Sequence, residues 1–579
     1  MRILHPSGHS TVAFAASELA TYLEHLGLTD VCTAANAVQP VRGDIVLHLQ
    51  PGEGLPAAIA ALVPSIRDDG FAGGGVDGIL YLTATTARGV LAAVYDFLER
   101  HCCVVFAGPG MEFLPQLTAL PPLPSAAVSN PDLAMRFLGL HALGDPALLP
   151  ALIDWLAKRR FNGLQLFAPQ FIAHRSVIRR EAVELRGMGL DVGAHSAFFF
   201  LPPARFLASH PQYFAKDING VAVARQLCYS NQAMVAALAD AVCAFLDHHA
   251  EVTVVGLWPE DGMVSCHCRD CAGQTVAPLI YQRIAEAAGL IACRHPQVLI
   301  NHLSYLNSTR PPEGAVPLPD NVLVNHCDYW DRTLNRPVHD FRYGTKPLKN
   351  SRESAEYART GASFRDHREI CAELRAWKRL TRHPTVFSYY SDLIIKQRLI
   401  TDVATSIRLD MGFLRDLGYR GFVDCCCHPE EWMAMAWNLY ALGVFAWHAE
   451  ADEDAVRRDF VRGAFGLHAV EAGLRFYRRL GELENDPSVL GFNTLDLLHR
   501  NPQETRFFAE PEAELIEPCR ARYERQLARL TACVDQLADH GAPADRLASL
   551  RSLVGQLGER LRSQFANYVG EQTLTAKTR

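Results

Sequence analysis

The stretch VTVVGLWPEDGMVSCHCRDC, residues Val252–Cys271, decides how the rest of this chain is interpreted. Val252 to Leu257 is a largely apolar run rich in β-branched residues, which is typical of a strand buried on both faces. The run then gives way to Trp-Pro-Glu-Asp-Gly, so the adjacent carboxylates Glu260 and Asp261 stand where a buried strand emerges. In parallel α/β folds the active site is built at the carboxyl ends of the strands.

The pair Glu260 and Asp261 is the candidate catalytic group. Two adjacent carboxylates that are partly buried cannot both ionise without cost, so one of their pKa values is expected to rise. A carboxyl with a raised pKa serves as a general acid near neutral pH. The alternative is a solvated turn in which both side chains face water, because turns favour Asp and Gly.

Strands and helices alternate on both sides of this stretch. The predicted strands are 136–140, 163–167, 191–195, 252–257, 298–305, 321–329, 385–390 and 419–425. The predicted helices are 146–160, 176–188, 231–248, 276–293, 366–380, 402–417 and 430–447. About eight strand–helix units over residues 133–450 have the size and rhythm of a (β/α)8 barrel of the TIM type.

Two further domains are expected outside the barrel, which makes this an α/β protein of three domains. Residues 1–125 alternate strand and helix patterns, with helices at 17–26 and 87–101 and strands at 44–49 and 78–83, so they predict a small α/β domain. Residues 113–132 are rich in Pro and Ser and are interpreted as a linker. The pattern of residues 451–579 predicts a helical C-terminal domain.

Polar and aromatic side chains recur at the carboxyl ends of the predicted barrel strands. Aromatic faces beside carboxylates and His suit sugar rings, which have an apolar C–H face and a hydroxyl rim. Each such residue taken alone is equally well explained as a hydrogen-bonded structural group or as barrel packing. The candidate substrate-binding residues are His195, Asn231, Trp258, Tyr305, His326, Asp328, Tyr389, Tyr390 and Asp392.

Composition excludes several other classes of protein. The chain has 579 residues, a formal net charge of -7 and no basic block, which argues against nucleic-acid and membrane-surface partners. It contains no apolar run as long as a bilayer span, and its first residues lack the pattern of a signal peptide. Many of the 16 cysteines lie in apolar stretches, which favours reduced thiols and a cytoplasmic location. The sequence leaves homo-oligomerisation open.

Three cysteines follow the carboxylates directly: Cys266, Cys268 and Cys271. Thiols at this spacing are typical of a structural Zn²⁺ site, although a distant fourth ligand is needed, with Cys228, His428 or one of residues 425–427 as candidates. The alternative is a loop of packed thiols. A catalytic metal is disfavoured because closed Cys-rich sites are usually structural. A Cys nucleophile is the weakest option, since no His–Asn or His–Asp partners stand out.

Several motifs resemble a known bacterial family. TARGVLAAVYDFLERHCCVVFAGPGMEFLP (Thr86–Pro115) resembles the end of the domain that precedes α-glucuronidase and hexosaminidase barrels. The remaining motifs resemble the family DUF4838, members of which are grouped as glycoside hydrolase family 163, acting on β-N-acetylglucosaminides. They are HPQYFAKDING (His210–Gly220), QLCYSN (Gln226–Asn231), LWPEDGMVSCHCRDC (Leu257–Cys271), VFSYYSD (Val386–Asp392), DMGFLRDLGYRGF (Asp410–Phe422) and NLYALGVFAWHAEAD (Asn438–Asp452).

The resemblance implies a retaining glycosidase that uses the 2-acetamido group of its own substrate and requires no cofactor. By analogy, the first acid of the pair orients the acetamido group as it closes to an oxazoline and the second donates the proton. The longer reach of Glu260 leaves the reverse assignment open. Tyr389 and Tyr390 would then hydrogen-bond the oxazoline or the ring hydroxyls. A cytoplasmic location favours a short oligosaccharide or glycoside as substrate.

Two other functions remain open at this point. An exo-glycosidase that acts on a uronic or other acidic sugar needs basic side chains, for which Arg332, Arg336 and Arg342 are candidates. It also needs a second, separated carboxylate, for which Asp328, Asp392 and Asp424 are candidates. The other alternative is a carbohydrate-binding protein with a catalytically inert barrel. The sequence does not decide the sugar, the linkage, or exo against endo action.

Overall fold

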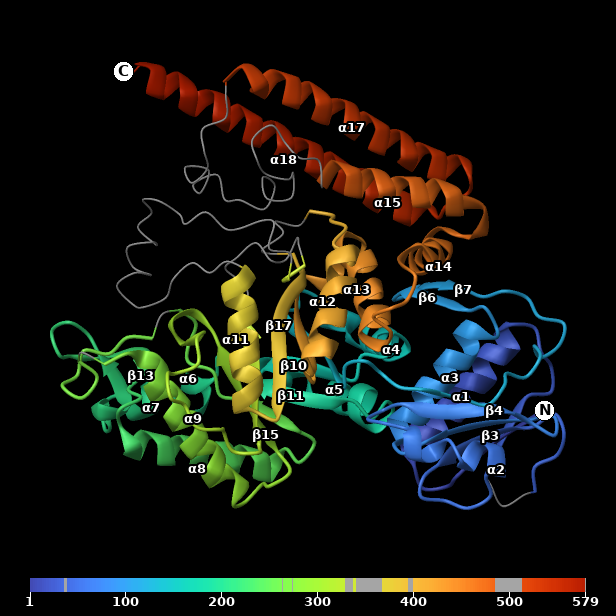
Figure 1. Cartoon of the computed structure of the whole chain (residues 1–579), viewed down its shortest axis with the longest axis horizontal. Coiled ribbons are helices and arrows are strands. Elements are labelled where there is room, and N and C mark those ends of the chain that lie inside the picture. The colour runs from blue at the N-terminus through green and yellow to red at the C-terminus, as the bar shows by residue number, and fades with distance from the viewer. Residues whose placement is uncertain are drawn as a thin grey trace.

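A computed structural model describes residues 1–35, 39–262, 264–272, 274–327, 337–339, 367–393, 399–484 and 513–577. It confirms the predicted fold class. A small α/β domain lies beside a closed barrel, and a layer of long helices lies over both (Figure 1).

Eight parallel strands close the barrel in the order β10, β11, β14, β15, β16, β17, β18 and β9. Their bounds are β9 (Met135–Ala142), β10 (Gly163–Phe167), β11 (Gly189–Gly193), β14 (Val254–Gly256), β15 (Leu299–Ser304), β16 (Val322–Cys327), β17 (His383–Asp392) and β18 (Gly421–Cys427). All eight predicted strands are therefore found. The apolar run at Val252 forms the fourth strand of the barrel in chain order, β14, paired with β11 and β15.

Helices follow the strands and cover the outside of the barrel. They are α4 (Leu149–Lys158), α5 (Ala168–Ile178), α8 (Gln232–His248), α9 (Val276–Ala292), α11 (His367–Leu380), α12 (Ala404–Leu417) and α13 (Trp432–Trp447). Helix α13 is apolar around nearly its whole circumference and is almost completely buried, because it packs between the barrel and the neighbouring helices. Helix α12 ends at Gly418, whose φ of +74° is the left-handed conformation that glycine adopts without strain.

The segment between β11 and α8, residues 194–231, contains helices and strands that no sequence pattern predicted. It contains the short helices α6 (Ala197–Phe200) and α7 (Pro203–Phe206) and an antiparallel hairpin of β12 (Phe214–Lys216) and β13 (Ala222–Leu227). Strands β12 and β13 are too short to show a clear alternation of apolar and polar residues, so the sequence did not predict them. The hairpin lies next to the loop that carries Glu260, because Gln226 of β13 donates a hydrogen bond to the Glu260 carbonyl.

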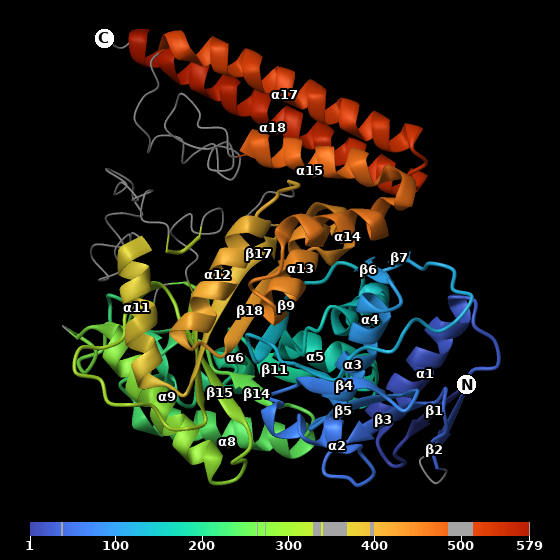
Figure 2. The same ribbon diagram turned by 45° about the vertical axis from the view of Figure 1, so that its right-hand side comes forward.

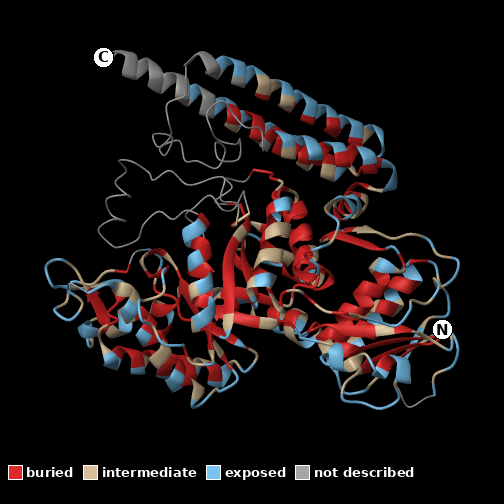
Figure 3. Ribbon diagram, in the orientation of Figure 1, coloured by how far each residue is buried: buried red, intermediate tan, exposed pale blue. Residues whose placement is uncertain are grey.

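Alternation along the barrel strands separates two environments. Outward side chains such as Leu164, Val192 and Ile300 join the main core beneath the helices. Inward side chains such as Phe137, Val254 and Phe387 form a separate cluster inside the barrel. Both sets are buried, so the barrel strands are red over most of their length (Figure 3).

The N-terminal domain is a six-stranded sheet in the order β2-β1-β3-β5-β4-β8. Its strands are β1 (Arg2–His5), β2 (Cys32–Ala35), β3 (Ile45–Leu49), β4 (Phe71–Val76), β5 (Ile79–Ala84) and β8 (Ala127–Ser129), with α1 (Ser10–His25) and α3 (Ala87–Arg100) as its long helices. Strand β8 lies within the segment interpreted as a linker, so this segment also supplies an edge strand, paired antiparallel with β4. A two-stranded hairpin of β6 (Val105–Gly108) and β7 (Met111–Phe113) follows α3.

Buried ion pairs join the N-terminal domain to the barrel, and Figure 2 shows the two parts side by side. The guanidinium of Arg136 on β9 is fully buried and lies 2.5 Å from the carboxylate of Asp69. The three basic residues that end α4, Lys158 to Arg160, also pair with acids of the N-terminal domain, Glu112, Asp96 and Glu99. Because these charges are removed from water, each depends on its partner.

The C-terminal helices are α14 (Glu453–Phe465), α15 (Val470–Glu484), α17 (Ala513–Asp539) and α18 (Ala544–Lys577). Figures 1 and 2 both show α15, α17 and α18 side by side as an elongated layer above the barrel. Arg546 of α18 donates hydrogen bonds to the carbonyls of Ala464 in α14 and of Gly110 between β6 and β7, so this layer contacts the N-terminal domain. Among the described helices, none has the length and apolar character needed to cross a membrane.

Candidate active site

The loop after β14 carries the two candidate catalytic carboxylates at the carboxyl-terminal rim of the barrel. A bridge between His195 and Trp258 continues the pairing of β11 with β14 beyond both strands, so the loop is anchored at its first residue. At the end of these strands, Gly193 and Gly256 approach so closely that a Cβ on either would overlap the backbone of the other strand. This close approach brings His195 and Glu260 to the same part of the rim.

Glu260 is half-buried and turned toward the amino-terminal end of α6. Its Oε1 accepts a hydrogen bond of 2.7 Å from the backbone N–H of Phe198, and its own carbonyl accepts one of 2.6 Å from Gln226. Burial raises the pKa of the Glu260 carboxyl, the Phe198 N–H opposes this, and the negative charge of Asp261 raises it further. The pair therefore contains one carboxyl that holds its proton to a higher pH than a free glutamic acid does.

Asp261 is exposed, with 73% of its side chain accessible, and its Oδ1 lies 3.8 Å from His195 Nε2. The Nδ1 of His195 contacts the carbonyl of Pro259, which only accepts hydrogen bonds, so Nδ1 carries the ring proton. Burial lowers the pKa of His195, which leaves the neutral ring with an acceptor nitrogen, Nε2, toward the rim.

Aromatic rings gather at the carboxyl end of the barrel next to the carboxylates; His195, Tyr305 and Tyr389 are half-buried, whereas Trp258 and Phe387 are buried. The ring of His195 lies 5.3 Å from that of Trp258 and 6.2 Å from that of Tyr305. Trp258 in turn lies 5.3 Å from Phe387, and Phe387 lies 5.1 Å from Tyr389. The structure thus brings four of the predicted substrate-binding residues together: His195, Trp258, Tyr305 and Tyr389.

Beneath these rings lies a polar network that sequence reasoning missed. We call it the interior network: His141, Gln165, Asp191, Asn301 and Trp258. Gln165 and Asn301 donate to Asp191 Oδ2 over 2.9 and 2.5 Å, Trp258 Nε1 donates to Asn301 over 3.2 Å, and His141 Nε2 lies 2.9 Å from Gln165 Oε1. Asp191 Oδ1, fully enclosed, has no hydrogen-bond partner among the described residues.

The charge of Asp191 is unfavourable in this position. Burial raises the pKa of its carboxyl to about 6, against the opposing hydrogen bonds from Gln165 and Asn301. Burial likewise lowers the pKa of His141 to about 4, so this ring is neutral near pH 7. The interior of the barrel therefore favours neutral forms of its titratable groups.

A first prediction concerns the dependence of stability on pH. Because the pKa of Asp191 is higher in the folded chain than in the unfolded chain, its contribution is fully present below about pH 4 and is lost as the pH rises through about 6. The Asp191→Asn variant does not titrate. Between pH 4 and 7 the wild-type protein is therefore expected to lose about 2.5 kcal/mol of unfolding free energy relative to the variant. Urea unfolding midpoints of both proteins across this range measure it, and parallel profiles would contradict it.

Asp392 lies at the end of β17 and faces the barrel interior together with two thiols of β18. Its Oδ2 lies 3.2 Å from Cys425 Sγ and 3.7 Å from Cys427 Sγ, and Cys425 Sγ lies 3.6 Å from His141 Nδ1. A bulge between Ser388 and Ser391 shifts the register of β17, which is why Asp392 faces the same side as Tyr389. Asp392 is thus inside the barrel but deep and nearly inaccessible.

Three predicted substrate-binding residues lie away from the barrel mouth. Asn231 is the cap of α8, where its Oδ1 accepts from the N–H of Met234. His326 is on the outer face of β16, with Nδ1 3.1 Å from Ser304 Oγ and Nε2 3.7 Å from Glu373 of α11. Tyr390 also points outward, and its hydroxyl donates to Asp410 of α12 over 2.6 Å. The side chains of these three residues make contacts within the fold and do not face the barrel mouth.

The structure describes only some of the candidate residues for the acidic-sugar alternative. Asp424 faces outward and accepts hydrogen bonds from the Ser388 hydroxyl and the Tyr390 N–H at the β17 bulge. Asp328, Arg332, Arg336 and Arg342 lie outside the described residues.

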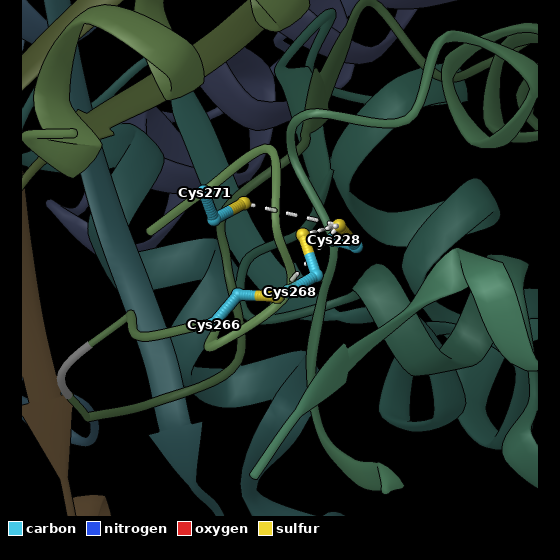
Figure 4. Close-up of side chains that lie close together, drawn as sticks. All are labelled: Cys228, Cys266, Cys268 and Cys271. Atoms are coloured by element: carbon cyan, nitrogen blue, oxygen red, sulfur yellow. Dashed lines mark hydrogen bonds between the residues drawn. The ribbon is translucent and has the colours of Figure 1, made fainter. Parts of the chain in front are cut away.

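Four cysteine sulfurs meet where the end of β13 contacts the loop after β14, residues 257–272, which also carries Glu260 and Asp261 and is called the acid loop (Figure 4). Cys266, Cys268 and Cys271 come from the predicted cluster, and the fourth is Cys228, one of the distant candidates, which follows β13. The other candidates, His428 and residues 425–427, are not part of this group. All fifteen cysteines whose side chains the structure describes are free thiols.

Comparisons with known proteins agree with this architecture. The family model of the domain of unknown function DUF4838 matches residues 133–477, which is more than half of the chain. The chain belongs to the DUF4838 family. No functionally curated protein sequence matches it. This DUF4838 protein therefore has to be interpreted from its own residues and from solved structures of similar fold.

Several solved structures share the fold of this DUF4838 protein at low sequence identity. One is the family GH115 4-O-methyl-α-glucuronidase BtGH115A, with specificity for decorated arabinogalactans, at 14% identity and a TM-score of 0.60, covering 97% of this chain and 72% of that one. Another is a GH138 enzyme that targets pectin rhamnogalacturonan II, at 11% identity and a TM-score of 0.58, covering 98% and 70%. CpGH84D is similar at 11% identity and a TM-score of 0.53, covering 99% and 90%.

Proposed function

We propose that this DUF4838 protein is a retaining glycoside hydrolase that acts on β-N-acetylglucosaminides with the help of the substrate's own acetamido group. The observation that carries the proposal is the adjacent pair Glu260 and Asp261 at the rim of a barrel with aromatic rings gathered at the same end. An aromatic floor beside carboxylates suits the apolar face and hydroxyl rim of a sugar. The proposal also draws support from the glycoside hydrolases that share the fold.

We assign the proton-donor role to Glu260, which reverses the order that analogy alone favours. A general acid has to hold its proton near the working pH, and burial raises the pKa of Glu260. Asp261 is exposed and next to Glu260, so it is the better candidate for the group that accepts a hydrogen bond from the acetamido N–H and orients it. The acceptor nitrogen of His195 is placed to bind a sugar hydroxyl.

The chemistry follows from these assignments. The acetamido oxygen attacks C1 as the bond from C1 to the leaving oxygen breaks, and Glu260 gives its proton to that oxygen. Asp261 stabilises the positive charge that develops on the acetamido nitrogen. The Glu260 carboxylate then takes a proton from the water that attacks C1 and opens the oxazoline. Two inversions at C1 retain the β configuration.

The deciding experiment compares matched aryl glycosides. Purified protein is assayed on an aryl β-N-acetylglucosaminide, the aryl β-glucoside and the aryl α-glucuronide, and then on the glucosaminides whose acetyl group carries one, two or three fluorines. Fluorine withdraws electrons from the acetamido oxygen and weakens it as a nucleophile. We expect turnover of the acetamido substrate alone, with kcat falling at each added fluorine.

Other outcomes separate the alternatives. Turnover of the glucoside, or no effect of fluorine, would exclude participation of the acetamido group and require a separated carboxylate nucleophile. Turnover of the α-glucuronide would favour the acidic-sugar alternative, in line with the name of the similarly folded BtGH115A. Binding of sugars by calorimetry with no hydrolysis of any substrate would favour an inert carbohydrate-binding barrel.

A second prediction concerns the pH profile of the active enzyme. Because Glu260 has to be protonated to act as the acid, and burial raises its pKa, kcat/KM is expected to fall tenfold per pH unit above that pKa. The Glu260→Gln variant has no proton to lose at this position, so its residual activity should lack this basic limb. A basic limb that persists unchanged in the variant would assign the limb to another group.

A further inference from the structure

The four sulfurs of Cys228, Cys266, Cys268 and Cys271 have the spacing of metal ligands. All lie within 4.8 Å of one another, and three of the separations are 3.7, 3.8 and 3.9 Å. Zinc–sulfur bonds of about 2.3 Å in a tetrahedron put the sulfurs about 3.8 Å apart. A disulfide requires about 2.05 Å, so the arrangement does not correspond to a pair of disulfides.

The surroundings of the sulfurs suit thiolates. The backbone N–H of Lys216 donates to Cys266 Sγ over 3.3 Å, and the hydroxyl of Ser230 lies 3.2 Å from Cys228 Sγ and 3.6 Å from Cys268 Sγ. Hydrogen bonds of this kind orient ligands and stabilise their charge in metal sites. A group of merely packed thiols needs neither these donors nor three separations from Cys228 that agree with the zinc geometry.

We propose that these four cysteines hold one Zn²⁺ ion in a closed, structural site. Four protein thiolates complete a tetrahedral shell and leave no open position for water, which is the pattern of structural and not of catalytic zinc. Binding of zinc releases the thiol protons, because zinc is ligated by thiolates. The ion would join two segments that are far apart in sequence: the end of β13 and the loop after β14.

The position of the site gives the ion a second role, which rests on the proposed function. The hairpin that precedes Cys228 also holds the acid loop, because Gln226 donates to the carbonyl of Glu260 and the N–H of His267 donates to the carbonyl of Lys216. The zinc ion would therefore fix the loop that carries Glu260 and Asp261 against the hairpin. It acts as a positioning element and takes no part in bond cleavage.

Metal content tests the site without reference to activity. The full-length protein is purified without added metal and analysed by inductively coupled plasma mass spectrometry, and thiol modification is followed by colorimetric detection of released zinc. We expect one zinc per chain, released as the four thiols react. Replacement by Co²⁺ should give the ligand-field and sulfur-to-metal charge-transfer bands of a tetrahedral tetrathiolate. Absence of zinc together with absence of these bands, or iron in place of zinc, would overturn the proposal.

Matched variants locate the ion. Cys228→Ser and Cys268→Ser should lower the zinc content to well below one per chain, whereas Cys293→Ser and Cys32→Ser, which change exposed thiols outside the group, should keep it. If the first two variants do not fold, the cobalt spectrum and the thiol-linked zinc release of the wild-type protein still decide the question. Full zinc content in a folded Cys228→Ser variant would contradict the four-thiol site.

The positioning role has its own measurement. Removal of zinc with a chelator should increase hydrogen exchange in residues 258–272 and 214–228 and leave exchange in the N-terminal sheet unchanged. If the proposed function holds, kcat should fall roughly 10- to 100-fold on zinc removal and recover when zinc is restored, since small displacements of reacting groups cost this much. Unchanged hydrogen exchange in these segments would contradict the positioning role of zinc, whether or not the protein is active. Loss of exchange protection on zinc removal, in a protein that hydrolyses no substrate, would support the positioning role of zinc. It would count only against the proposed glycosidase function.

Discussion

Glu260→Gln is expected to lower kcat/KM for an alkyl β-N-acetylglucosaminide by about 10²–10⁴-fold, the usual contribution of a positioned general acid. The glutamine keeps the size of the side chain and an oxygen for the Phe198 N–H, so the loop should stay folded. The same variant should lose far less activity on a 2,4-dinitrophenyl glycoside, because that leaving group departs without a proton. Initial rates on the two substrates measure the difference.

Asp261→Asn supplies the contrast that separates the two roles. An orienting carboxylate acts on the acetamido group and not on the leaving oxygen, so this variant should lose activity equally on both substrates. Asp270→Asn, which changes another exposed carboxylate in the same loop, is the matched control and should retain activity. If Asp261→Asn shows the leaving-group dependence and Glu260→Gln does not, the assignment of roles is wrong.

Asp69→Asn is expected to destabilise the protein by roughly 3 kcal/mol, the largest effect on stability that we predict. The Asp69 carboxylate lies 2.5 Å from Arg136 and 3.4 Å from Arg88, and both guanidiniums are buried. Removing the negative charge leaves two buried cations without their counterion. Thermal unfolding should show a melting temperature lower by about 2–4 °C, because the entropy of unfolding is large for a chain of 579 residues.

The neighbouring residue provides the control for this prediction. Asp68 pairs with Arg420 over 3.2 Å, but both side chains are substantially exposed to solvent. Asp68→Asn should therefore change the unfolding free energy by less than about 1 kcal/mol. Asn also tolerates the positive φ of 53° at this position, so backbone strain does not confuse the comparison. Equal shifts in the two variants would show that burial of the charge is not what matters.

The sequence predicted the barrel well because strands buried on both faces are apolar throughout. The run before Leu257, for example, has only one hydroxyl, that of Thr253, to interrupt its apolar character, and the helices between strands have the spacing of one buried face. The β12–β13 hairpin and β8 were not foreseen. Strands this short depend on their pairing partners more than on their own composition.

The candidate site was predicted less completely, because successive side chains of a strand point to opposite faces and the sequence does not show which face is which. Tyr389 and Tyr390 are neighbours in sequence, yet one faces the barrel mouth and the other contacts Asp410 outside the barrel. Which residue faces inward depends on register, and a bulge changes it between Ser388 and Ser391. His326 was assigned to the pocket for the same lack of register information.

Other features were hidden by distance along the chain. Gln165 and Asp191 lie in the middle of their strands, where the sequence offers no sign that their side chains meet inside the barrel. Cys228 is far from the CxCxxC cluster and had only been one of several candidates for a fourth thiol. The cluster itself was recognisable because close thiols are unusual in a loop, whereas its completion required the fold.

The interior network has a consequence for anyone who redesigns the proposed glycosidase for a different sugar. Gln165 and Asn301 each hold two neighbours in place, so a change at either also frees groups that depend on it for a hydrogen bond. Substitutions there are expected to be strongly interdependent, and libraries that vary one position at a time would find few improvements. New specificity is therefore best sought at positions outside this network.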